Sequence, residues 1–144
     1  MGDSWAQQRT EAARLQAERL RERQDAEHAR AEAMLARFVT EAREAGLAPE
    51  PLVMRGYGGR GTARTPLRGW YLRTDRTAAV SDDGAFYVMT APLSLLDRLR
   101  GVRPEPRRPP LVLGAGGKDG DSIELSAALD RLLPGRRPGT APGV

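Results

Sequence analysis

Cysteine is absent from the chain of 144 residues, so neither a disulfide bond nor a thiolate metal site can form. Histidine occurs once, at His28, in a polar stretch where we expect it to be solvated. A multi-histidine metal site and Ser–His–Asp catalysis both need more than this. We therefore expect no metal, no cofactor and no enzymatic activity. Catalysis that uses only Asp, Glu, Arg and Tyr is the alternative left open.

Long apolar runs are missing as well. No segment approaches the ~18 consecutive apolar residues of a membrane-spanning helix. The N-terminal stretch MGDSWAQQRTEAARLQ also has no apolar centre of the kind that a secretory signal needs. We therefore expect a cytoplasmic protein that makes no membrane contact.

Lysine is almost absent, since Lys118 is the only one among 23 basic residues. Arginine, alanine, glycine and proline all have GC-rich codons, so a GC-rich genome raises the four together. The arginine content, and the net charge of +4 that goes with it, is therefore explained by codon usage as readily as by nucleic-acid binding.

The residues from 4 to 45 predict one long helix, because good helix formers dominate and neither glycine nor proline occurs between Gly2 and Gly46. Gly46 is suited to ending the helix. From Ala31 onward the apolar positions repeat at helical spacing, which predicts that this half packs one face on a core. They are Ala31, Met34, Leu35, Phe38, Val39 and Ala42.

The first half of this helix is polar on all sides. Its larger apolar residues are Trp5, Leu15 and Leu20, which do not form one continuous stripe. Glu and Arg recur three or four residues apart, and each such pair stabilises a helix by roughly 0.2–0.5 kcal/mol. A polar helix of this length bridges solvent, meets a partner or frays. We expect residues 1–30 to be a projecting arm.

The middle of the chain predicts short strands at 51–56, 69–74, 77–81 and 85–90, with Asp82-Asp83-Gly84 as a hairpin turn. We expect the fold class to be α+β, with the long helix docked on a small antiparallel β-meander. On the helix, Met34, Leu35 and Phe38 would supply the contact. The predicted core residues of the sheet are Trp70, Leu72, Val80, Phe86 and Val88.

The last third predicts a short helix at 92–100, an extended proline-rich stretch at 103–110, strand-like segments at 111–113 and 122–125, and a helix at 126–133. The tail at 134–144 has nothing to bury and is predicted to be disordered. We therefore expect residues 31–133 to form a single α+β domain.

Two segments are strongly basic. Within 55–76 there are six arginines and one aspartate, and within 98–108 there are five arginines and one glutamate. Together they predict, as an alternative function, binding to RNA or single-stranded DNA. Tyr57 would stack on an unpaired base. The residues that would take part are Arg55, Tyr57, Arg60, Arg64, Arg68, Arg107 and Arg108.

The glycine-rich stretch LGAGGKDGDS at 113–122 is similar to a phosphate-binding loop but departs from it. A Walker loop needs a hydroxyl residue after its lysine, and here Asp119 follows Lys118. The stretch also fails as a calcium-binding EF-hand, because Ile123 and Glu124 stand where an acidic or amide residue and a glycine belong. An enzyme acting through Asp119 and Asp121 would need a pocket with buried carboxylates.

The segments GWYLRTDRTAAVSDDGAFYVMTAP and PPLVLGAGGKDGDSIELSAAL are similar to small uncharacterised proteins of GC-rich actinobacteria. The resemblance covers residues 30–133 in outline. It implies a cytoplasmic location and favours codon usage as the source of the arginines, and it transfers no catalytic or binding residue.

The leading functional hypothesis is a non-enzymatic protein-interaction module. The helical arm would bind a protein partner or a second copy of the chain, because it is too long and too polar to serve the core of the domain. The partner-binding residues would be Trp5, Leu15 and Leu20. Nucleic acid is the alternative partner.

Overall fold

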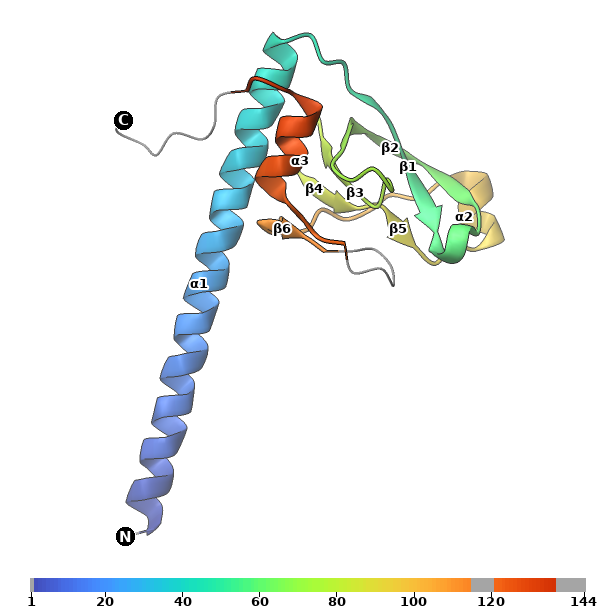
Figure 1. Cartoon of the computed structure of the whole chain (residues 1–144). Coiled ribbons are helices and arrows are strands. Elements are labelled where there is room, and N and C mark those ends of the chain that lie inside the picture. Colours follow the sequence, from blue (N-terminus) through green and yellow to red (C-terminus); the bar gives the residue numbers. More distant parts are fainter. Residues whose placement is uncertain (1, 115–120, 137–144) are drawn as a thin grey trace.

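The computed structural model describes residues 2–114 and 121–136. Its longest element is helix α1, Gly2–Glu44, which runs unbroken for 43 residues. The helix ends as predicted: Gly46 adopts φ 74°, and the amide of Leu47 donates to the carbonyl of Ala42 at 2.9 Å. Figure 1 shows the N-terminal half of α1 standing clear of the other elements.

The chain after α1 forms one five-stranded sheet. Its strands are β1 (Glu50–Gly56), β2 (Thr62–Tyr71), β3 (Ala78–Ser81), β4 (Phe86–Val88) and β5 (Thr90–Ala91). The first four are antiparallel neighbours in chain order, which confirms the predicted meander. With the long helix beside this sheet, the fold class is α+β as expected.

The sheet closes on itself, which the sequence did not predict. β4 and β5 are separated only by Met89, yet β4 pairs with β3 while β5 pairs in parallel with β1 at the other end of the strand order. Met89 joins the two ends: its amide donates to the carbonyl of Thr77 at 2.8 Å, and its carbonyl accepts from the amide of Arg55 at 2.9 Å. One continuous segment therefore completes a small ring of strands.

The first core lies between α1 and the outer face of this ring, where the predicted contact is confirmed. Phe38 meets Trp70 edge to face, with ring centroids 5.5 Å apart. Val88 and Met34 are only half-buried and pack at the margin of the cluster. The buried members are Ala31, Leu35, Phe38, Val39, Ala42, Trp70, Leu72, Ala78, Val80, Phe86, Leu113, Leu125, Ala128 and Leu129.

A second core lies on the opposite face of the strands, inside the ring. Side chains alternate along a strand, so Phe86 points toward α1 while its neighbour Tyr87 points inward. Burial raises the pKa of the Tyr87 hydroxyl above its ordinary value, and the charge of Asp83 adds to this effect. The buried members are Leu52, Met54, Ala63, Ala79, Tyr87 and Met89.

The predicted hairpin turn at 82–84 is confirmed, and Gly84 takes φ 91° there. The carboxylate of Asp83 accepts the hydroxyl of Ser81 and the amide of Ala85, the latter at 3.1 Å. These hydrogen bonds, that of Ser81 above all, hold the pKa of Asp83 below its ordinary value despite partial burial. The turn is therefore stabilised most when the Asp83 side chain is ionised.

Helix α2 (Leu95–Arg100) follows the sheet, and a two-stranded sheet of β6 (Val112–Leu113) and β7 (Ile123–Glu124) leads into α3 (Leu125–Leu132). Both predicted helices exist: α2 begins later than the predicted 92–100, and α3 is shifted by one residue from the predicted 126–133. In Figure 1, α3 lies beside the C-terminal half of α1, while α2 lies at the end of the molecule farthest from α1.

Two sequence predictions are corrected. Residues 57–68, between the predicted strands at 51–56 and 69–74, are expected to be a loop, but Arg64 and Arg68 belong to the ten-residue strand β2. The predicted disordered tail begins too early, because Arg136 is ion-paired with Asp130 at 2.8 Å and its side chain is 5% exposed. Residues 137–144 lie outside the described residues.

Candidate interaction surfaces

The projecting arm of α1 comprises residues 2–24 rather than the expected 1–30, because Asp25 and His28 contact the proline-rich connection. Arg108, from the proline-rich connection, donates to Asp25 at 2.9 Å and to Glu32 at 3.1 Å. These hydrogen bonds, with Glu32 first, raise the pKa of the Arg108 guanidinium above its ordinary value. His28 lies 2.8 Å from the carbonyl of Pro109 through Nδ1 and is half-buried, so the prediction of a solvated His28 is wrong.

Within the part of the chain that the structure describes, the polar contacts of residues 2–24 lie within the arm itself. Arg14 pairs with Glu11 at 2.5 Å and with Glu18 at 3.2 Å, the three- and four-residue spacings that are expected to stabilise the helix. At the tip, the guanidinium of Arg9 lies 4.6 Å from the centre of the Trp5 ring. Trp5 is still 62% exposed and, with Leu15 and Leu20, remains free of the domain.

The arm carries a stripe that continues the core face of α1, and the sequence analysis missed it. The residues that α1 buries at Ala31, Leu35, Phe38 and Ala42 are three or four positions apart. The same spacing continued toward the N-terminus meets mostly small residues, which is why no apolar pattern was visible. They are Ala6, Thr10, Ala13, Ala17, Leu20 and Gln24, and we refer to these six as the arm stripe.

The predicted nucleic-acid residues do not form one surface. Arg107 donates its backbone amide to Phe86, and Arg108 pairs with the acids of α1, so neither joins the other five. Arg68 donates to the carbonyl of Pro49 at 3.2 Å. Arg107 and Arg108 therefore lie beside β4 and α1, apart from the smaller group around the β1–β2 turn, and their part in nucleic-acid binding stays a prediction.

This smaller group surrounds Tyr57, which is 58% exposed. A shallow hollow of about 490 Å³ lies beside the ring, and it is lined by Tyr57, Gly58, Arg60, Pro92, Leu93 and Arg98. Gly58 and Gly59 both have positive φ, so the turn is tight rather than extended. Tyr57 thus lies in the open, with Arg60 and Arg98 lining the same hollow.

Helix α2 borders this hollow and exposes its leucines. Leu95 and Leu99 are each 74% exposed, and Leu96 is 53% exposed. The spacing of Leu93, Leu96 and Leu99 predicts one helical face that helps to close the core. Only Leu93 packs against the second core, and the other two point into solvent. The periodicity gave the helix correctly but could not tell which of its faces is buried.

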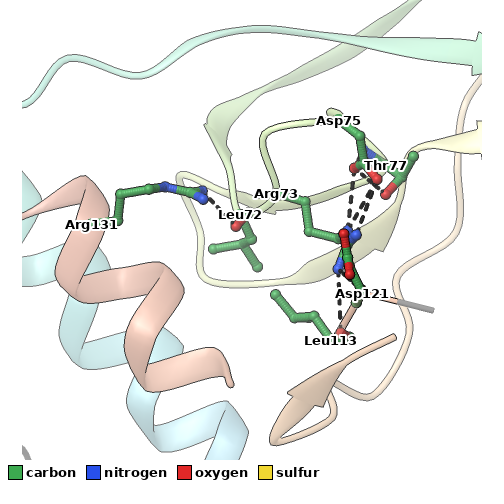
Figure 2. Close-up of polar contacts among 7 residues, drawn as sticks. All are labelled: Leu72, Arg73, Asp75, Thr77, Leu113, Asp121 and Arg131. Carbon is green, nitrogen blue, oxygen red and sulfur yellow. Dashed lines mark hydrogen bonds and ion pairs between the residues drawn. The ribbon is translucent and has the colours of Figure 1, made fainter. Parts of the chain in front are cut away.

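The region of the glycine-rich loop is a structural junction (Figure 2). Arg73 donates to the carboxylate of Asp75 at 3.2 Å and to the backbone carbonyls of Leu113 and Asp121 at 3.4 and 3.1 Å. Arg131 of α3 donates to the carbonyl of Leu72 at 2.9 Å. The two arginines thus tie the last third of the chain to the sheet.

The same junction gives no support to an enzyme acting through this loop. Asp121 is exposed, and Asp119 lies outside the described residues. A nearby hollow of about 250 Å³ is lined by no carboxylate among the described residues. Burial opposes the ionisation of Asp75, but its hydrogen bonds with Thr77 and Arg73 outweigh this and lower its pKa, which suits a structural ion pair.

Two further findings concern residues 2–114 and 121–136 alone. No cluster of three or more His, Asp or Glu side chains is placed there to hold a metal ion. None of the helices in this part of the chain is both long enough and apolar enough to cross a membrane.

Comparison with known proteins brings no relative: no family model, no curated protein and no solved structure matches the chain. The resemblance to actinobacterial proteins therefore stays a prediction. The surfaces described above have to be interpreted from their own geometry.

Proposed function

We propose that this protein is a non-enzymatic, cytoplasmic protein-interaction module that binds another helix through its arm, either in a partner protein or in a second copy of itself. The observation that carries the proposal is the length of α1 that extends beyond the other described elements. Residues 2–24 extend about 35 Å at 1.5 Å per residue. Their side chains from Ser4 onward are exposed except at Glu18.

The arm is well anchored for such a role. An isolated helix of this length is marginal in water, because its first turn is costly to form. Here the docked half supplies the first turns, and Arg108 holds Asp25 and Glu32 on either side of His28. The arm therefore continues an existing helix in a fixed direction from the domain, which lowers the entropy lost on binding.

The arm stripe supports a helix as the partner. Alanine at positions 6, 13 and 17 allows the backbone of a second helix to approach closely, and Leu20 supplies an apolar contact. Trp5 at the tip adds the kind of aromatic side chain that dominates binding energy at protein interfaces. Leu15 lies on the opposite side of the helix from the arm stripe and would take no part in this contact.

The test is sedimentation of the full chain over a range of concentrations, together with a pull-down from the native cell. Ala17→Glu puts a charge on the arm stripe and should abolish either the self-association or the capture of the partner. Ala12→Glu is the matched control, since Ala12 is equally exposed on the same helix but lies off the stripe. A chain that is monomeric at all concentrations and captures nothing that Ala17→Glu releases would refute the proposal.

A second candidate function is favoured by the exposure of Tyr57 beside Arg60. In it, Arg55, Tyr57, Arg60 and Arg64 bind RNA or single-stranded DNA, with Tyr57 stacked on a base. The affinity of such binding should fall steeply as the salt concentration rises. Arg60→Ala should reduce the slope of this salt dependence. Lack of any binding at low salt would eliminate this candidate.

A further inference from the structure

Helix α2 presents an apolar face that the fold does not use. Successive residues of a helix are turned by about 100°, so Leu95, Leu99 and Leu96 share one side. All three are exposed, Leu95 and Leu99 to 74%. They lie on the part of the molecule that Figure 1 shows farthest from α1. A contiguous exposed patch of large apolar side chains marks an interaction site more often than a single exposed leucine does.

Polar contacts, rather than these leucines, fix the position of α2. Ser94 and Asp97 cap its start reciprocally, with distances of 3.0 and 3.1 Å. At its end, the amide of Val102 donates to the carbonyl of Arg64 at 2.8 Å. On its flank, Arg98 donates to the carbonyl of Arg60 at 3.2 Å. The helix is thus held firmly while its leucines stay available.

Arginine surrounds the leucine face. On the helical wheel, Arg98 and Arg100 lie on either side of the leucines, whereas Asp97 points back toward the cap. Two hollows border the helix. The first, already described beside Tyr57, contains Arg60 and Arg98. The second, of about 460 Å³, contains Arg64, Arg100 and Arg103. Both therefore bring positive charge to the margin of the apolar face.

We propose that this α2 surface (Leu95, Leu96 and Leu99 with Arg98, Arg100 and Arg103) binds an acidic amphipathic helix of another protein. The apolar side of such a helix would cover the leucines, and its glutamates and aspartates would meet the arginines on either side. This is the complementarity by which an amphipathic helix recognises an apolar surface with a charged margin.

Other occupants fit the surface less well. A second copy of this chain, paired face to face, would bring arginine against arginine around the leucines. A single-stranded nucleic acid would use the arginines but leave the three leucines exposed to water. The inference concerns a surface separate from the arm, so the failure of either proposal leaves the other standing.

The experiment uses the full chain and a fluorescent 18-residue peptide with leucine on one helical face and glutamate elsewhere, followed by anisotropy. We expect binding that weakens with salt. Replacing Leu95 and Leu99 together by serine should weaken it at least tenfold, and so should Arg100→Glu with Arg103→Glu. Because these side chains are exposed, the unfolding midpoint of each variant should stay that of the wild type.

Matched controls lie away from α2. Val112→Ser changes an apolar side chain on β6 that is 51% exposed, and Arg21→Glu with Arg23→Glu reverses two charges on the arm outside the arm stripe. None of these should alter peptide binding. The same peptide with lysine in place of glutamate should not bind.

Several outcomes would overturn the proposal. The wild-type chain does not bind the acidic peptide, or the lysine peptide binds equally well. The leucine and arginine variants bind like the wild type. An oligothymidylate strand, or vesicles of phosphatidylglycerol, bind more tightly than the peptide and lose affinity in the leucine variant.

Discussion

Two helices of this molecule treat their apolar residues in opposite ways. The C-terminal half of α1 buries Leu35 and Phe38 completely against the sheet and α3. The six-residue α2 is held at the other end by its cap and by backbone contacts, and it turns Leu95 and Leu99 outward. Apolar periodicity is present in both. What decides burial is whether a complementary face is available, which a local pattern does not contain.

The largest difference in stability between the two helices is expected from a substitution in α1. Phe38→Ala should lower the free energy of unfolding by about 3–5 kcal/mol, since it removes a fully buried ring beside Trp70 and leaves a cavity. Leu99→Ala, on α2, should change it by no more than about 0.5 kcal/mol. Urea titration of both variants measures the difference. Equal effects would mean that α2 is buried in solution.

The next largest effect on stability is expected at Gly101, where α2 ends. Gly101 has φ 86°, and a Cβ there would lie 2.7 Å from the carbonyl oxygen of Arg64. Gly101→Ala should therefore cost about 1–3 kcal/mol through strain and overpacking. It should also weaken peptide binding to α2 while leaving the arm unaffected. Gly114→Ala is the control, because no atom of the described residues lies within 4 Å of a Cβ placed there.

The turn at 82–84, on the α1 side, predicts a dependence on pH. A carboxylate whose pKa is lowered by folding stabilises the protein above its ordinary pKa, and this stabilisation is lost as the pH falls through the lower, folded value. Ser81→Ala removes the main cause of that lowering for Asp83.

The free energy of unfolding of Ser81→Ala should be about 1 kcal/mol lower than that of the wild type at pH 7, as is typical of the loss of one hydrogen bond. Its difference from the wild type should shrink as the pH drops below 3.8, the ordinary value for this group. Chemical denaturation at several pH values follows both proteins. Stability curves that stay parallel down to pH 2 would contradict the assignment.

The smallest effect is expected where α1 leaves the domain. Arg108→Ala removes both contacts with Asp25 and Glu32, which are exposed and worth little to overall stability. Amide hydrogen exchange at residues 20–30 should nevertheless become faster, because the start of the arm loses its tie to the domain. Arg21→Ala, without such contacts in the described chain, serves as the control. Unchanged exchange would show that His28 and the helix itself suffice.

Much of the fold could be predicted from the sequence, because local signals agree with it. The absence of helix breakers before Gly46 gave α1, the Asp-Gly pair gave the β3–β4 turn, and the spacing from Ala31 to Ala42 gave the docked face. Closure of the sheet could not be predicted, because it depends on a long-range parallel pairing of only two residues in each strand.

The candidate surfaces were predicted less well. The three exposed apolar residues of the arm were identified by size, while the arm stripe escaped notice because alanine carries little hydrophobic signal. The arginine counts predict one basic surface. In the structure, however, Arg108 pairs with an acidic residue of α1, and Arg64 donates to the carbonyl of Leu99 in α2. Charge along a sequence does not reveal which cations are already engaged by the fold.

Closure of the sheet at Met89 also limits how the protein can meet others. An open sheet offers unpaired amides along its edge, onto which a foreign strand can add. Here the outward amides of β1 are occupied: that of Arg55 by Met89, and that of Val53 by the hydroxyl of Tyr71 at 2.8 Å. Pro51 has no amide hydrogen to offer. Strand addition along β1 is therefore disfavoured.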